Sequence, residues 1–165
     1  MSRIGKAPIS LSGGVTVQSS RGNIVIKGPR GEVKRNIPQG ISVATVGENL
    51  EVTRANSDRR TRALHGLVRA QLASDITGVT DGWTKTLELS GVGYRASIAG
   101  NDLTISVGFS HPVLIAPPPG ITFSTQENKI VVSGIDKQLV GQVAAGDSQG
   151  SETRAAAEAV EAEPL

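Results

Sequence analysis

Short runs of alternating apolar and polar residues fill most of the first half of the chain and predict β-strands. Polar turns such as SSRGN, GPRG and VGEN separate these runs. Short alternating segments divided by turns of this kind are typical of antiparallel strands joined as hairpins. The predicted strands of the first half are 15–17, 24–26, 32–35, 41–44 and 50–53.

A different period follows these strands and predicts one amphipathic helix. Its apolar residues recur at spacings of three and four, which places them on one stripe of a helix. The residues of this predicted stripe are Leu64, Leu67, Val68, Leu72 and Ile76. Ser57 or Asp58 is a suitable N-cap, and Gly78 is a suitable end. A sheet with one apolar face and one such helix makes a complete two-layer domain.

The second half of the chain repeats this order of elements. Its predicted strands are 87–89, 94–98, 103–107, 111–115, 121–124 and 130–133. Asp136 is the expected cap of a second helix, and the inner side of that helix carries Leu139, Val140 and Val143. The turn AGND closes a hairpin between two of these strands.

An internal repeat accounts for this similarity between the halves. At a shift of 80 positions, the matching turn residues are Gly28 with Gly108, Pro38 with Pro118 and Gly40 with Gly120. Glycine and proline are placed by backbone dihedral angles, so matching positions imply matching turns. We therefore predict an α+β protein made of two tandem copies of a small antiparallel β-sheet packed on one α-helix. The copies are expected over residues 1–80 and 82–145.

Charge is distributed unevenly, although 17 basic and 15 acidic residues give a net charge of only +2. Residues 1–80 hold 12 basic and 5 acidic residues (+7), and residues 81–145 hold 4 and 5 (−1). Residues 146–165 hold 1 basic and 5 acidic residues (−4). A basic first half favours phosphate or another polyanion as partner. The acidic, alanine-rich last stretch has no apolar stripe, so we expect residues 146–165 to be a disordered tail.

The sequence contains no convincing catalytic or metal site. The GVG at 91–93 lacks the third glycine and the following helix of a dinucleotide-binding loop. Ser110 and His111 are adjacent, which seldom aligns a hydroxyl with an imidazole, and no Gly-x-Ser-x-Gly motif supports them. His65 is expected on the polar side of its helix, and two histidines without clustered carboxylates make a poor metal site. We expect no enzyme, no cofactor, no metal and no small-molecule substrate.

Other features of the sequence indicate the cellular compartment of the protein. No apolar run approaches the roughly 20 residues of a membrane-spanning helix. The start MSRIGKAPIS lacks the apolar core of a secretory signal. The absence of cysteine excludes disulfides and fits a reducing compartment. We expect a soluble intracellular protein with no membrane partner.

Structured RNA is the partner that best fits the basic turns. One Trp, one Tyr and two Phe are too few for a platform on which single strands stack. Lys or Arg stands beside glycine at 21–22 and 27–31, and Arg95 follows the turn at 91–94. Such turns let a backbone approach phosphates and add charge-assisted bonds, which recognise RNA shape rather than base order. Two alternatives stay open: ordinary hairpin turns with solvated cations, and a β-rich adaptor whose sheet edges pair with proteins.

Several segments resemble the bacterial large-subunit ribosomal protein L6 family. They are SRIGKAPI, ALHGLVRAQL followed by GVTDGW, LSGVGYRA, GFSHPV and GIDKQLVGQVAA, in the same order over residues 1–145. GVGYRA together with GFSHP is a fairly specific combination. The resemblance implies two tandem sheet-plus-helix units and binding to 23S rRNA near the sarcin–ricin loop and the stalk base. It also implies neighbouring large-subunit ribosomal proteins as partners, translation factors nearby, and a location in the cytoplasmic ribosome.

The resemblance and the charge pattern supply the candidate RNA-binding residues. By resemblance the second repeat faces the RNA, and its candidates are Lys85, Tyr94, Arg95, Ser110, His111 and Lys137. The basic first repeat adds Lys6, Lys27, Arg62 and Arg69.

The resemblance stops at Ala145. Family members continue the last helix into a basic segment with a Pro-Tyr-Lys-Gly-Lys-Gly-like motif that enters the rRNA. This chain instead has an acidic tail without lysine. Like charge repels phosphate, so the tail is a poor replacement for the missing contact. A shifted reading frame late in the gene, a diverged end and an engineered end would each produce such a break.

Overall fold

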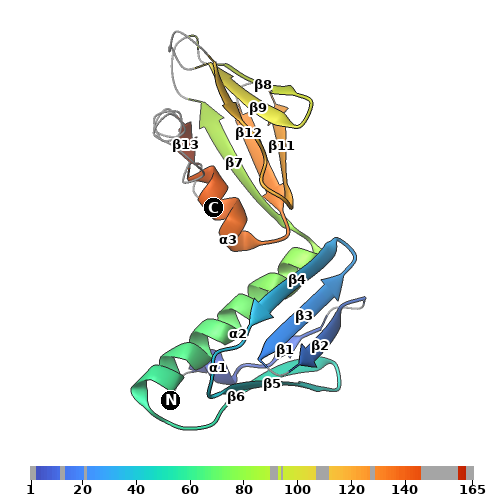
Figure 1. The fold of residues 1–165 in the computed structure, drawn as a ribbon, viewed down its shortest axis with the longest axis vertical. Helices are drawn as coiled ribbons and strands as arrows, with labels where there is room; N and C mark the ends of the chain where they lie inside the picture. Colours follow the sequence, from blue (N-terminus) through green and yellow to red (C-terminus); the bar gives the residue numbers. More distant parts are fainter. Residues whose placement is uncertain are drawn as a thin grey trace. The chain divides into compact units, whose positions relative to one another are not determined.

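The structure is a computed structural model that describes residues 3–11, 14–20, 22–89, 93, 95–106, 112–126, 129–145 and 160–162. The chain divides into two compact units, unit 1 (Met1–Gly82) and unit 2 (Trp83–Leu165). Each unit contains antiparallel β-sheets and a helix, α2 in unit 1 and α3 in unit 2, that packs with them (Figure 1). The predicted α+β class, with two copies of a sheet-plus-helix unit, is confirmed.

Unit 1 packs two small antiparallel sheets with its long helix. Within the described residues, one sheet has the strand order β1-β6-β5 and the other has the order β2-β3-β4. The elements are α1 (Arg3–Lys6), β1 (Ile9–Ser10), β2 (Thr16–Ser20), β3 (Asn23–Gly28), β4 (Gly31–Asn36), β5 (Ile41–Val46), β6 (Asn49–Arg54) and α2 (Arg59–Thr80). The most deeply buried side chains come from both sheets and from α2: Ile24, Ile26, Leu50, Leu72 and Val79.

Unit 2 has the same kind of construction with a shorter helix. Its sheets have the strand orders β10-β9-β8 and β11-β12-β7-β13. The elements are β7 (Trp83–Leu89), β8 (Arg95–Ala99), β9 (Asp102–Ser106), β10 (Val113–Ile115), β11 (Ile121–Gln126), β12 (Lys129–Gly134), α3 (Lys137–Ala144) and β13 (Val160–Ala162). The core includes Leu87, Leu89, Leu103, Ile105, Phe123, Ile130, Val132 and Val140.

The strand orders show the duplication directly. The order β1-β6-β5 in unit 1 corresponds to β7-β12-β11 in unit 2, and β2-β3-β4 corresponds to β8-β9-β10. The register of one hairpin is also repeated: β5–β6 pairs Ile41 with Arg54, and β11–β12 pairs Ile121 with Gly134, 80 positions later. The predicted shift therefore holds along the whole of this hairpin.

The turn before this hairpin is repeated with it. Gly40 and Gly120 both have a φ of 86°, a left-handed conformation that favours glycine. The N–H of the next residue donates to the carbonyl oxygen of Pro38 at 3.3 Å in unit 1 and of Pro118 at 3.1 Å in unit 2. The glycine and proline matches in the sequence thus mark one turn that occurs twice.

The first hairpin of each unit follows a slightly different shift. The β2–β3 hairpin pairs Thr16 with Lys27, and the β8–β9 hairpin pairs Arg95 with Ser106, 79 positions later. One residue has therefore been gained or lost between the two hairpins of a repeat. Gly108, part of a predicted match, lies outside the described residues.

Both longer helices begin at the predicted aspartate caps. The Oδ1 atom of Asp58 accepts a hydrogen bond from the backbone N–H of Thr61 at 2.8 Å. The Oδ1 atom of Asp136 accepts one from the backbone N–H of Gln138 at 2.9 Å. Each cap satisfies a backbone donor that a helix leaves without an internal partner.

The end of α2 differs from the prediction. The helix does not stop at Gly78, which is buried inside it, but continues to Thr80. The glycine that ends it is Gly82, which has a φ of 83°. The N–H groups of Asp81 and Gly82 both donate to the carbonyl oxygen of Thr77, at 2.8 and 3.2 Å. A left-handed glycine just after the C-cap is the common way to end a helix.

The buried stripe of α2 also differs from the prediction. Val68, Leu72 and Ile76 are buried as expected, but Leu67 is 51% exposed and His65 is only 4% exposed. His65 lies three residues before Val68 and therefore on the same side of the helix. Leu67 directly precedes Val68 in the sequence, so its side chain points about 100° away from that of Val68 around the helix axis. The expectation that His65 faces the polar side is wrong.

Three short elements were not predicted. The segments α1 and β1 have too few residues for a hydrophobic period to show in the sequence. The third element, β13, pairs antiparallel with β7 and places Val160 opposite Leu89 and Ala162 opposite Leu87. We expected residues 146–165 to be a disordered tail, and these three residues instead have backbone partners. The other tail residues lie outside the described part of the chain.

Candidate nucleic-acid interface

Unit 1 brings three candidate cations to one part of its surface, where α1 packs on α2. Lys6 belongs to α1, and its side chain is exposed. Arg62 and Arg69 lie seven residues apart on α2, which is two turns and therefore the same side of the helix. Arg62 is exposed and Arg69 is half-buried. We refer to Lys6, Arg62 and Arg69 as the α1/α2 basic face.

Arg69 uses its guanidinium inside the unit. Its Nε donates to the carbonyl oxygen of Ala7 at 3.1 Å, and its Nη2 donates to the carbonyl oxygen of Pro8 at 3.3 Å. These bonds join the middle of α2 to the segment that links α1 with β1. The hydrogen bonds of Arg69 therefore serve the fold of unit 1.

His65 lies under the same segment. Its Nε2 is 2.8 Å from the carbonyl oxygen of Val52, and because a carbonyl can only accept, Nε2 carries the proton. Its Nδ1 is buried and has no hydrogen-bond partner among the described residues. Gly5 packs on the ring: a Cβ at that position would lie 2.6 Å from Cε1 and 2.9 Å from Cγ. His65 is therefore a buried packing residue.

Lys27 is separate from this face. It lies on β3, and its Nζ forms an ion pair with Glu32 at 3.5 Å; the same carboxylate pairs with Lys34 at 3.4 Å. Hydrogen bonding and charge attraction from Lys34, and then from Lys27, lower the pKa of Glu32. The carboxylate offsets part of the positive charge at this point on the sheet.

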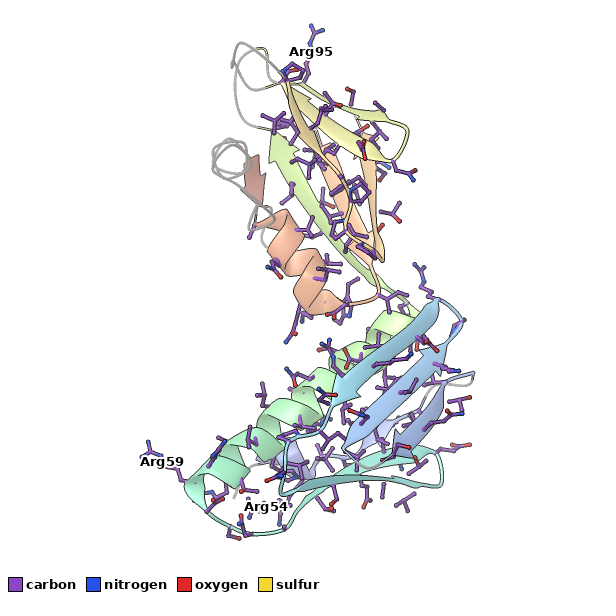
Figure 2. All side chains as sticks on the ribbon, in the orientation of Figure 1. Arg54, Arg59 and Arg95 are labelled. Atoms are coloured by element: carbon purple, nitrogen blue, oxygen red, sulfur yellow. The ribbon has the colours of Figure 1, made fainter. Side chains whose placement is uncertain are left out.

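Three arginines near the start of α2 were not among the candidates. Arg59 and Arg60 are exposed in the first turn, and Arg54 is half-buried at the end of β6. Arg54 and Arg59 lie at the same end of unit 1 (Figure 2). None of the three forms an ion pair within the described residues. The sequence RRTR at 59–62 is the signal that could have identified two of them.

In unit 2, two candidates lie near the start of β7. Lys85 is half-buried on β7. Lys137 opens α3, and its Nζ is 4.4 Å from the centre of the Trp83 ring, within the range of a cation–π contact. Lys137 is nevertheless exposed, so its charge stays available to a ligand.

Arg95 lies elsewhere in unit 2. It begins β8, is exposed, and points away from the unit (Figure 2). The loop that leads to it leaves the Leu89 end of β7, and the two ends of a seven-residue strand are about 20 Å apart. The structure therefore does not place Arg95 beside Lys137. Tyr94, Ser110 and His111 lie outside the described residues.

Other kinds of site find little support in the described residues. These residues include no group of three or more His, Cys, Asp or Glu side chains that could hold a metal ion. No helix among them has the length and apolar character needed to cross a membrane. A cavity of about 510 Å³ in unit 1 is lined by Ser19, Ser20, Gly22, Ile37, Pro38, Gln39, Ile41, Ser42 and Val43. Its lining carries no charge and adds nothing to the basic surface.

Comparison with known proteins covers both units. A sequence model for the family described as Ribosomal protein L6 matches residues 12–82 and 90–146. The large ribosomal subunit protein uL6 of Symbiobacterium thermophilum is 54% identical over 147 residues, or 88% of this chain and 82% of that protein. The protein of the same name from Synechococcus sp. (strain JA-3-3Ab) is 51% identical over 146 residues, 88% and 81% of the two chains. That of Trichormus variabilis is 46% identical over 146 residues, 88% and 80%.

Proposed function

The chain belongs to the ribosomal protein L6 family, and from this we propose that it is a structural protein of the large ribosomal subunit that binds 23S rRNA near the sarcin–ricin loop and the stalk base. Its partners are then the rRNA and neighbouring large-subunit proteins, with translation factors nearby, in the cytoplasmic ribosome. Its relatives are structural ribosomal proteins, so the chain is not an enzyme. The observation that carries the proposal is the family match over both repeats.

Phosphate contact by exposed cations is the mechanism we propose for unit 1. Lys6 and Arg62 are exposed on the α1/α2 basic face. Arg59, Arg60 and Arg62 add charge to the positive end of the helix dipole at the start of α2, and the cap carboxylate of Asp58 offsets only part of this charge. A phosphate backbone would offset this accumulation of positive charge, and each neutralised phosphate would release a condensed counterion.

In unit 2 the proposed contacts are more widely spaced. Arg95 is exposed where β8 begins, and Lys137 is exposed at the start of α3. Lys85 has a half-buried side chain two residues after Trp83. The resemblance adds Tyr94, Ser110 and His111, which lie outside the described residues. Separated contacts of this kind suit recognition of RNA shape.

The test is a salt titration of the full chain with a 23S rRNA fragment that contains the sarcin–ricin loop. Fluorescence anisotropy of the labelled fragment measures affinity, and a plain RNA duplex of equal length is the competitor. The proposal requires tighter binding to the rRNA fragment than to the duplex. On B-form DNA, each phosphate contact contributes about 0.9 to the slope of log K against log salt. A variant with Lys6→Gln and Arg62→Gln should therefore have a slope smaller by roughly two contacts.

Lys34→Gln is the matched control for charge. Lys34 is an exposed cation of the same unit, but Glu32 already pairs with it at 3.4 Å. Its loss should leave the salt slope and the affinity nearly unchanged. Equal affinity of the unaltered chain for the rRNA fragment and the duplex would contradict the proposed function.

A further inference from the structure

The segment that carries Lys6 packs at a fixed position on α2. The backbone of Gly5 lies so close to the imidazole of His65 that any side chain at residue 5 would displace the ring or the segment. His65 itself has little freedom to move, since it is buried and its Nε2 bonds the carbonyl oxygen of Val52 at 2.8 Å. The close packing of Gly5 on His65 fixes one side of the segment.

Arg69 fixes the other side of the same segment. Its two hydrogen bonds, of 3.1 and 3.3 Å, reach the carbonyl oxygens of the two residues that follow Lys6. Beyond them, Ile9 is buried and pairs with Leu50 of β6. The backbone is therefore fixed on both sides of Lys6, by packing at Gly5 and by the hydrogen bonds of Arg69 after Lys6.

We propose that Arg69 is a positioning residue, which holds the segment around Lys6 so that this lysine joins Arg62 in contacting RNA. Arg69 does not itself contact phosphate in this account. The inference rests on the proposed function, because it concerns how one of the proposed contacts is assembled. Fixing a contact residue before binding lowers the conformational cost of association, and affinity rises accordingly.

The geometry separates this role from that of a direct contact. A guanidinium offers donors in a planar fork, and here two of them reach successive carbonyl oxygens. A lysine at residue 69 would keep the charge but could not reproduce the fork. A direct phosphate contact tolerates that exchange better, because lysine binds phosphate well as a point charge. Arg69→Lys therefore distinguishes the two roles.

The experiment is a double-mutant cycle in the full chain, with the rRNA fragment described above as the probe. Arg69→Lys and Arg69→Gln should each weaken binding roughly tenfold, which corresponds to about 1.4 kcal/mol. When Lys6 has already been changed to glutamine, the same substitutions should weaken binding less than about twofold. Wild-type affinity in Arg69→Lys would overturn the proposal. So would an Arg69→Gln effect that is equally large with and without Lys6.

Gly5→Ala tests the positioning of the Lys6 segment without altering any charge. The added methyl group meets the His65 ring and should displace the segment, so binding should weaken by a similar factor. Gly141→Ala is its control, since a Cβ there meets no atom within 4 Å. Unchanged affinity in Gly5→Ala would contradict the positioning role.

Hydrogen exchange separates failure of this inference from failure of the proposed function. If the unaltered chain does not bind the rRNA fragment, the proposed function fails, while exchange still reports on the segment. Amides of residues 5–7 and 9 should exchange faster in Arg69→Lys than in the unaltered chain, with β3 unchanged. Equal exchange at residues 5–7 and 9 in the two chains would overturn the positioning role of Arg69.

Discussion

Replacing Asp75 with asparagine removes the charge from one half of a buried ion pair in unit 1. Oδ2 of Asp75 accepts from Nε of Arg35 at 2.9 Å, and Oδ1 accepts from Nη2 at 2.9 Å. The aspartate side chain is 3% exposed and the arginine side chain 23% exposed. The pair joins α2 to β4, so its loss should loosen the contact between the helix and one of the sheets.

The burial of the two side chains sets the expected size of the effect. Removing one partner of a buried pair costs about 3–5 kcal/mol, whereas exposed pairs contribute about 0–1 kcal/mol. Water can still reach part of the Arg35 side chain after the substitution, which favours the lower end of the range. We expect Asp75→Asn to lower the free energy of unfolding of unit 1 by about 3 kcal/mol. The total free energy of unfolding of a domain is about 5–15 kcal/mol, so a change of this size should be easily measured.

The assay must report on unit 1 alone, since two units need not unfold together. Hydrogen exchange followed by mass spectrometry gives this resolution, combined with a urea titration that follows circular dichroism. Peptides from β4 and α2 should lose protection, and peptides from β11 and β12 should not. Asp81→Asn is the matched control: the same substitution at an exposed residue just after the same helix, where about 0.5 kcal/mol or less is expected.

A loss below about 1 kcal/mol, the level of an exposed pair, would refute the reasoning. A second variant tests the cause of the loss. Replacing Arg35 by methionine and Asp75 by leucine removes both charges and supplies apolar surface. Buried pairs replaced in this way often recover the lost stability. The double variant should therefore be more stable than Asp75→Asn.

The remaining predictions concern the glycines, one helix cap and the tail. Gly134→Ala should destabilise unit 2 by roughly 1–3 kcal/mol in a urea titration, because the added Cβ would lie 2.7 Å from a core side chain. Gly141→Ala, in an open helical position, should instead stabilise it by about 0.5–1 kcal/mol. Hydrogen bonds from the Thr61 hydroxyl and then from its backbone N–H lower the pKa of Asp58. The stabilising effect of this cap is therefore present above the ordinary aspartate pKa and is lost as the pH falls through the lowered pKa. Amides in the first turn of α2 should thus exchange faster, relative to the intrinsic rate, at pH 2 than at pH 6, and this change should disappear in Asp58→Asn, which caps without titrating. Ending the chain after Ala145 removes a net charge of −4 and should strengthen binding to the rRNA fragment, most of all at low salt; equal affinity of the two chains would exclude repulsion by the tail.

Most of the strands and turns could be predicted because their signals are local. Alternation and glycine turns locate the hairpins, and the repeated Pro-x-Gly before β5 and β11 locates the duplicated turn. The aspartate caps were also visible, because a cap acts on the next two or three residues. Such features depend on nearest neighbours in the chain, and nearest neighbours can be read from a sequence.

The errors came from contacts between distant residues. His65 was expected outside because histidine is polar, but the carbonyl oxygen of Val52, 13 residues earlier, accepts a hydrogen bond from its Nε2 and so allows its burial. Leu67 was expected inside and is exposed, since the stripe through His65 already faces the sheets. Arg69 was predicted as a candidate RNA contact, and its hydrogen bonds to residues 61 and 62 positions earlier in the chain could not be read from the sequence. Charge type could be predicted from the sequence, but the partner of each charge depends on the fold.

The two repeats keep their hairpins and differ in their helices. Helix α2 has 22 residues and α3 has 8, or about 33 and 12 Å at 1.5 Å per residue. His65, Arg69 and Asp75 all belong to α2, so the packing of the Lys6 segment and the buried ion pair both depend on the longer helix. The described part of unit 2 has no helix long enough to carry a similar arrangement. If both repeats bind rRNA, we expect unit 1 to do so through cations assembled on and beside its long helix, and unit 2 through separated residues such as Arg95 at a strand end and Lys137 at the start of α3.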